Sequence, residues 1–225
     1  SSATKMTGRP GSGIVVPAKM RAAREAGHET GIHCHNHYRW QDHLHRMTAA
    51  EVAAEFDAAR AEYRRIFGEE ARTAGAAGWQ SNALSRTVYD DAGLLYSSDT
   101  RGNAPFFPRI GATLHRTLEI PSTLPTLDEL MGRPEFPDHT LAAHLLSLLR
   151  PDRLNVFTLH AEIEGMGRRR IFRDFLARCR GQGVEFIRLD EEAKRLLAHR
   201  ETIPVCEQIL APIDGRSGLV ATQAA

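Results

Sequence analysis

Histidine is concentrated in one short stretch of the chain. Six of the eleven histidines fall between residues 28 and 45, where even scattering would place about one. They are His28, His33, His35, His37, His43 and His45. Because neutral imidazole is the commonest protein ligand of divalent metals, this stretch is a candidate metal site. A His-rich polar surface loop explains the composition about equally well.

Three of these histidines alternate where a predicted strand, Glu29 to His33, ends. Alternate residues of a strand share a face, so two of His33, His35 and His37 could bind one ion. A histidine pair alone is incomplete, because catalytic metal sites usually have three protein ligands and one position open to water.

Further polar or aromatic residues follow other predicted strands. They are Trp79, Asp99 and His160. The carboxylates of Glu162 and Glu164 follow His160 closely and could orient its ring or raise its pKa. A lone histidine or tryptophan in such a place is more often structural. Since active sites of parallel α/β folds gather at the carboxyl ends of strands, the convergence of these residues favours an enzyme.

The elements that would position these residues alternate between helix and strand. The clearest helix begins with a capping box between Thr48 and Glu51 and carries apolar residues three and four apart until Gly68. Residues 100–125 hold four prolines and are predicted as a long ordered loop. The other predicted helices are 18–26, 82–91, 126–131, 139–149, 169–180 and 190–199, and the strands are 29–33, 72–76, 94–98, 154–159 and 184–189. This alternation predicts an α/β fold with a parallel sheet or barrel.

Composition limits the class of protein. The 225 residues carry a formal net charge of +1, so no overall field attracts nucleic acid, and the apolar runs are far shorter than the ~18 residues of a membrane span. Three cysteines without CxxC spacing indicate neither a disulfide framework nor a zinc knuckle, which fits a reducing compartment. We expect a flexible loop at 1–16, one domain at 17–199 and an extended C-terminal appendage at 200–225.

Several strings of residues resemble the polysaccharide-deacetylase family, the NodB-homology or carbohydrate-esterase type. The segment from Glu29 to His37 (ETGIHCHNH) is similar to the metal motif of that family, and Phe157 to His160 (FTLH) to the motif that supplies its catalytic acid. Other strings resemble its branch of deformylases, which act on undecaprenyl-phosphate-linked 4-deoxy-4-formamido-L-arabinose. These strings are AAGW at 76–79, YSSDTRG at 96–102, IPSTLP at 120–125 and HAEIEG at 160–165. The resemblance covers about Pro10 to Gly218.

The resemblance implies a distorted (β/α) barrel and metal-assisted hydrolysis of an amide. It assigns His33 and His37 as ligands of a divalent ion, which could be zinc, manganese or cobalt, and His160 as the general acid. Further residues are expected at the substrate: His35, Trp79, Asp99, Arg101 and Glu162. For Arg101, whose guanidinium suits a phosphate diester, an Asp99–Arg101 pair that merely fixes the loop is equally plausible.

One motif of the family is not found. Its acidic pair, which gives the catalytic base and the third metal ligand, should precede His33, yet the first aspartate is Asp42. Glu25 and Glu29 fall in segments matched to other parts of the family. We therefore expect a barrel that is incomplete at its amino-terminal end, a truncated chain, and weak or no activity as it stands.

Three functions stay open. The first is deformylation of the lipid-linked amino sugar in lipid A modification, which confers resistance to cationic antimicrobial peptides such as polymyxin. The second is N-deacetylation of a carbohydrate, and the third is a non-catalytic remnant that binds glycan or membrane. The first implies a cytoplasmic protein at the inner face of the bacterial inner membrane. The arginine-rich helix predicted at 169–180 could lie on anionic lipid, although an ordinary outer barrel helix is favoured two to one.

Overall fold

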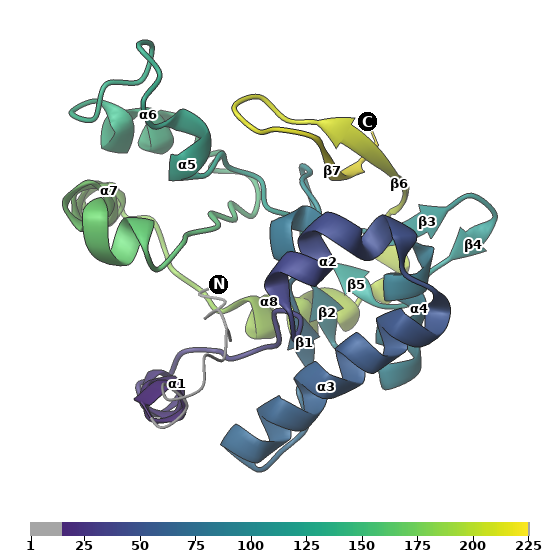
Figure 1. Ribbon diagram of the computed structural model, residues 1–225. Coiled ribbons are helices and arrows are strands. Elements are labelled where there is room, and N and C mark those ends of the chain that lie inside the picture. The colour runs from purple at the N-terminus through teal and green to yellow at the C-terminus, as the bar shows by residue number, and fades with distance from the viewer. Residues whose placement is uncertain (1–14, 225) are drawn as a thin grey trace.

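Short parallel strands form the centre of the computed structural model, which describes residues 15–224. Strand β2 (Tyr96–Ser97) lies between β1 (Thr73–Ala74) and β5 (Leu118–Glu119), and all three run parallel (Figure 1). Ile32 extends this arrangement through a parallel bridge to Ala74. The predicted α/β class with a parallel sheet is confirmed.

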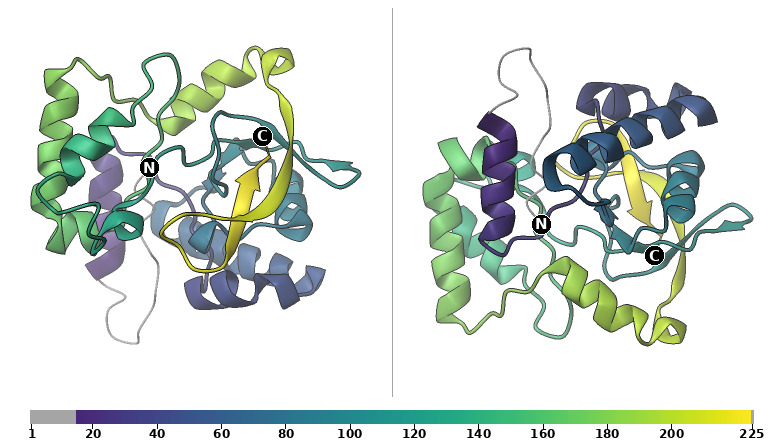
Figure 2. Two further views of the ribbon diagram at one scale, coloured as in Figure 1. Left: turned by 90° about the horizontal axis from the view of Figure 1, so that it is seen from above. Right: turned by 90° about the horizontal axis from the view of Figure 1, so that it is seen from below.

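A second sheet packs beside the first and includes the C-terminal tail. Its order is β4 (Thr113–Leu114), β3 (Phe107–Ile110), β6 (Val205–Pro212) and β7 (Leu219–Gln223), with β3 and β6 parallel and the outer pairs antiparallel. Figure 2 shows the β6–β7 hairpin crossing the molecule next to the central strands. The tail expected to be an appendage thus completes this sheet.

Two of the strand predictions and one loop prediction are wrong. Residues 100–125 contain β3, β4 and β5, because Pro108 is tolerated in β3, where its carbonyl accepts a hydrogen bond from the His115 N–H at 2.8 Å. Segments 154–159 and 184–189 have strand-like sequences but form no regular strand within the described residues. Only Val156 pairs, accepting the N–H groups of Thr123 and Leu124 at 3.0 and 3.1 Å.

The predicted helices are confirmed to within a few residues. They are α1 (Val15–Glu25), α3 (Ala49–Phe67), α4 (Ala83–Ala92), α5 (Leu127–Leu130), α6 (Leu141–Ser147), α7 (Arg169–Gly181) and α8 (Leu189–Leu197). Short helical turns are η1 (Leu44–Arg46), η2 (Ala77–Trp79), η3 (Ile163–Gly167) and η4 (Arg200–Thr202). The loop predicted at 1–16 lies mostly outside the described residues, and its last two residues belong to α1. Within residues 15–224 no helix is both long and apolar enough to cross a bilayer.

Helix α3 shows how local sequence fixes an element. The Thr48–Glu51 capping box is present at its start, and Gly68 ends it with a left-handed φ of 74°. Its predicted apolar stripe is buried and consists of Val52, Phe56, Ala59, Tyr63 and Ile66. Phe56, Ala59 and Tyr63 pack in one cluster with residues of α4 and β1, whereas Val52 packs with residues of α2 (His37–His43) and η1. In Figure 1, α3 and α4 lie on one side of the central strands and α5, α6 and α7 on the other.

Helix α2 (His37–His43) is absent from the sequence-based expectations. Asn36 caps its start, because the Asn36 side chain accepts the Arg39 N–H at 3.0 Å. Cys34 has a left-handed φ of 51°, which ends the extended segment immediately after His33. The histidine stretch is therefore a strand end, a sharp turn and a helix.

Candidate active site

His33 and His37 lie together in a pocket of about 160 Å³. Their ring centroids are 5.2 Å apart. His33 Nδ1 is 2.6 Å from the carbonyl oxygen of Gly75, which can only accept, so Nδ1 donates and the neutral ring carries its lone pair on Nε2. Metal-binding histidines are commonly held by such a second hydrogen bond.

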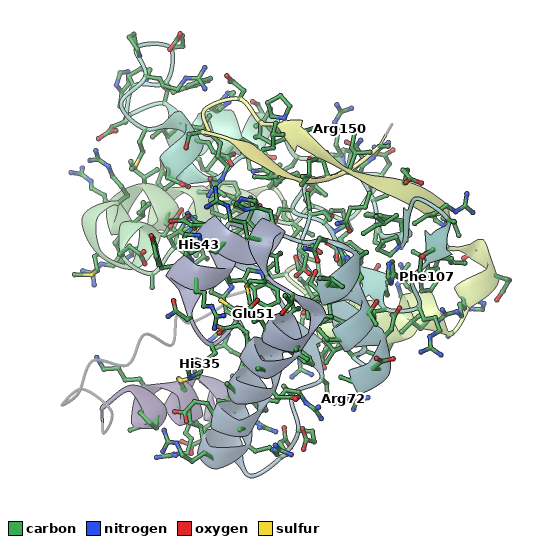
Figure 3. The ribbon with its side chains drawn as sticks, turned by 45° about the vertical axis from the view of Figure 1, so that its right-hand side comes forward. His35, His43, Glu51, Arg72, Phe107 and Arg150 are labelled. Carbon is green, nitrogen blue, oxygen red and sulfur yellow. The ribbon has the colours of Figure 1, made fainter. Side chains whose placement is uncertain are left out.

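His35 does not join this pair. The turn at Cys34 and the start of α2 at His37 break the strand alternation on which the spacing argument rested. His35 is exposed and lies outside the pocket lining. Figure 3 shows His35 and His43 well apart, so the histidine-rich stretch does not form one cluster. Its predicted contact with substrate stays a prediction.

The donor set fits a divalent ion in part. Two imidazoles on one wall of a small pocket match two of the three protein ligands of a usual catalytic site. Among residues 15–224 no group of three or more His, Cys, Asp or Glu side chains is arranged to hold a metal. A third protein ligand is therefore not supplied by the described part of the chain.

His160 and Glu162 line the same pocket. The backbone N–H of His160 donates to Glu164 Oε2 at 2.7 Å, and burial raises the pKa of the Glu164 carboxyl. His160 Nδ1 is buried and lies 3.5 Å from Asp128 Oδ1 of α5, at ion-pair range although no hydrogen bond joins the two atoms. A carboxylate beside Nδ1 orients the ring and leaves Nε2 as the nitrogen that can exchange a proton.

Trp79 forms another part of the wall. The chain reaches it through left-handed backbone at Gly78 (φ 60°) and Trp79 itself (φ 52°), so the turn η2 is tight. The indole N–H donates to Ser122 Oγ at 3.1 Å. The guanidinium carbons of Arg101 and Arg216 lie 5.0 and 4.4 Å from the ring centroid, which fixes the ring by cation–π contacts.

Asp99 and Arg101 are buried and do not line the pocket. Asp99 Oδ1 accepts the Ala76 N–H at 2.7 Å, while Arg101 pairs with Glu129 and donates to the Leu124 carbonyl at 3.0 Å. Each side chain therefore fixes a loop, although not through the other. Their burial favours the structural alternative stated above over contact with substrate.

A buried charge network that the sequence did not indicate lies behind the pocket. Arg86 of α4 is fully buried between Glu119 and Asp99, with Nη1 2.8 Å from the former carboxylate and 3.8 Å from the latter. Burial raises the pKa of Asp99 to about 7, against the effect of the Arg86 charge. Gln208 of β6 accepts from Arg86 Nε at 2.8 Å, which ties the C-terminal hairpin to this network.

The sequence carried only weak signals for this network. Glu119 lies between Leu118 and Ile120, an alternation typical of a strand, but the prolines of this segment favoured a loop. Arg86 lies in a correctly predicted helix, but nothing in its spacing marks a buried arginine. Gln208 lies in the tail that was expected to be peripheral.

The chain is similar in sequence to known deformylases and in fold to known deacetylases. No family model matches the chain. A probable 4-deoxy-4-formamido-L-arabinose-phosphoundecaprenol deformylase, ArnD, from Shewanella sediminis is 33% identical over 206 residues, 91% of this chain and 65% of that protein. The corresponding protein of Wigglesworthia glossinidia brevipalpis is 29% identical over 87% of this chain and 68% of its own length. The chain thus spans about two-thirds of these relatives.

The structure of a putative polysaccharide deacetylase from Mycobacterium smegmatis superposes with a TM-score of 0.65 at 17% identity, covering 88% of this chain and 71% of that one. The chain has the fold of the polysaccharide deacetylases. This confirms the predicted fold class and the predicted resemblance, including the likeness to the deformylase branch. Within the polysaccharide-deacetylase fold, the His33–His37 pair and His160 lie on one pocket.

Proposed function

We propose that the chain belongs to a metal-dependent hydrolase that removes the formyl group from a lipid-linked 4-deoxy-4-formamido-L-arabinose. The observation that carries this proposal is that His33, His37 and His160 line one small pocket, with Asp128 beside the His160 ring. The activity for which the two ArnD relatives are named supports the choice of substrate. Such an enzyme serves lipid A modification and resistance to cationic antimicrobial peptides.

His33 and His37 would hold the divalent ion. When bound, such an ion polarises the formyl carbonyl and makes a water more acidic. His160 gives its Nε2 proton to the sugar nitrogen as the C–N bond breaks, while Asp128 keeps the ring oriented. The reaction consumes one water and releases formate and a free 4-amino sugar. Trp79 and the Gly75–Gly78 backbone line the pocket, and a site that Trp79 closes around the acyl group would favour formyl over the larger acetyl.

The second candidate is the N-deacetylase, which uses the same residues on an acetamido sugar. The experiment uses the protein in a form that includes the acidic motif expected before His33, supplies it with zinc, manganese or cobalt, and offers the lipid-linked sugar with a radiolabelled formyl or acetyl group. Formate release that stops with a chelator supports the proposal. Release of acetate alone supports the deacetylase, and release of neither, with any of the metals, contradicts both.

Helix α7 supports a position near the membrane that holds the substrate. Its apolar residues Phe175 and Cys179 are buried against α6, while Arg169, Arg170 and Arg173 are exposed. The apolar face thus serves the fold, and only the arginines remain for lipid headgroups, each contributing about 1 kcal/mol at an anionic surface. Sedimentation with anionic vesicles should fall with salt and with these arginines changed to Gln. Sedimentation that is indifferent to both would remove α7 from this role.

A further inference from the structure

The loop between β6 and β7 is held against the pocket by contacts at several points. Arg133 Nη1 lies 2.7 Å from Asp214 Oδ2, and Gln80 Nε2 donates to the Leu219 carbonyl at 2.9 Å. Gly215 has a φ of 78° and passes so close to the Glu129 carbonyl that an added Cβ would collide with it. Only glycine fits this crossing. The loop is therefore a fixed wall that places its next residue, Arg216.

Arg216 brings a positive charge to the pocket. Among the described residues that line the pocket it is the only lysine or arginine. Its side chain is 19% exposed and stacks on the ring of Trp79. Nη1 lies 3.3 Å from Glu129 Oε1 and 3.6 Å from Asp128 Oδ2. The side-chain contacts of Arg216 within residues 15–224 run through Nη1 or the stacked face, which leaves the Nε and Nη2 edge for a ligand.

The other arginine at Trp79 cannot serve this purpose. Arg101 is 7% exposed, donates to the Leu124 carbonyl and pairs with Glu129. Arg101 already balances the Glu129 charge, so the carboxylate left to offset the Arg216 charge is Asp128, at 3.6 Å, which His160 Nδ1 also faces at 3.5 Å. The arginine suited to an anion is thus the one on the hairpin, in the part of the chain that sequence analysis treated as an appendage.

We propose that Arg216 binds the phosphodiester of the lipid-linked sugar and sets the preference of the pocket for anionic over neutral glycosides. This inference rests on the proposed function. A guanidinium offers two parallel N–H groups to phosphate oxygens, and stacking on Trp79 holds that fork in place before substrate arrives. The formamide would then lie between this anchor and the histidines.

The test compares an anionic probe and a neutral probe that carry the same sugar. One is 4-formamido-4-deoxy-L-arabinose linked through phosphate to a short prenyl chain, and the other is the methyl glycoside of the same sugar. Calorimetric titration should show that Arg216→Gln lowers affinity for the phosphodiester about 10- to 100-fold, with Arg216→Lys intermediate. Affinity for the methyl glycoside should change by less than about twofold. Arg65→Gln, which removes an exposed arginine outside the pocket, is the matched control and should leave both affinities unchanged.

A second pair of variants moves Arg216 without changing it. Gly215→Ala collides with the Glu129 carbonyl, whereas Gly218→Ala has the same φ of 78° and meets nothing within 4 Å. Both carry the same backbone strain, so a selective loss of phosphodiester affinity in Gly215→Ala alone supports the placement. Equal losses for both probes, or no loss in Arg216→Gln, would overturn the inference.

The outcome also separates this inference from the proposed function. If no formate is released but Arg216→Gln lowers affinity for the phosphodiester probe alone, the proposed function is wrong and the anion site is supported. If formate is released from the phosphodiester with the same KM in Arg216→Gln and the unchanged protein, the function stands and the assignment of Arg216 is overturned.

Discussion

The pocket and the buried charge network behind it both contain a polar residue that follows an extended segment, and that residue has a different role in each. In the pocket, partly exposed histidines surround space for a ligand. Behind the pocket, the network of Arg86, Asp99 and Glu119 is fully buried, and its charges are directed at one another and at backbone N–H groups. Both His160 and Asp99 follow short extended segments that end at this edge of the sheet.

Comparing Asp99 with His160 shows what makes a polar residue at this position structural or catalytic. Asp99 meets a buried arginine and the Ala76 N–H, so its charge holds the turn that carries Trp79. His160 has Asp128 beside Nδ1 of its ring and lines the pocket, which leaves its other nitrogen for proton transfer. A polar residue at a strand end is therefore structural where partners enclose it and chemical where they do not.

The largest expected effect comes from removing the centre of the buried network. Arg86→Leu leaves Asp99 and Glu119 buried without their cation, and removing one partner of a buried ion pair costs about 3–5 kcal/mol. Urea unfolding should show this loss. The control Arg65→Leu breaks an exposed pair with Glu62 and should cost less than about 1 kcal/mol. Similar losses in both variants would erase the distinction between the two regions.

Metal binding should depend on His33 and His37. We expect His33→Ala or His37→Ala to lower zinc affinity about a hundredfold or more, measured by competition with a chromophoric chelator. His35→Ala, two residues from either, should keep the affinity because its side chain lies outside the pocket. Loss of zinc in His35→Ala with retention in His33→Ala would reverse the assignment.

The pH dependence of stability should report on Asp99. Burial raises its pKa to about 7 in the folded protein, against 3.8 when exposed, so between these values the folded state binds the additional proton. Stability must then fall as pH rises from about 4 to 7, by at most about 1.4 kcal/mol per pH unit, and level off above pH 7. Asp99→Asn keeps an acceptor for the Ala76 N–H and should remove this slope. Urea midpoints of both proteins that shift in parallel across this range would show that Asp99 is ionised throughout.

The sequence was most informative where local chemistry decides the structure. The capping box at Thr48, the stripe from Val52 to Ile66 and the glycine stop at Gly68 are properties of one segment, and all three are present. The motif around His33 and His37 likewise predicted that these two histidines lie together, and they do. The turn at Cys34, and not strand alternation, places them so.

The sequence-based predictions were wrong or incomplete where the local structure depends on residues far away in the chain. Segments 154–159 and 184–189 have the composition of strands, but a strand also needs a neighbour, which composition cannot supply. Arg216 is 56 residues from His160 in the chain and reaches the pocket only because β6 pairs with β3. Such a contact has no signature in local pattern, and the same holds for Gln208.

The central claim is that chemistry belongs to the pocket and stability to the network behind it. Formate release from the lipid-linked formamido sugar by His160→Ala tests it most directly, with His144→Ala, a partly buried histidine of α6 outside the pocket, as the control. The account predicts that His160→Ala lowers turnover about 10²–10⁴-fold, while zinc affinity is unchanged and unfolding free energy stays within about 1 kcal/mol. Turnover that survives in His160→Ala, or that is lost only together with the metal or the fold, would contradict it.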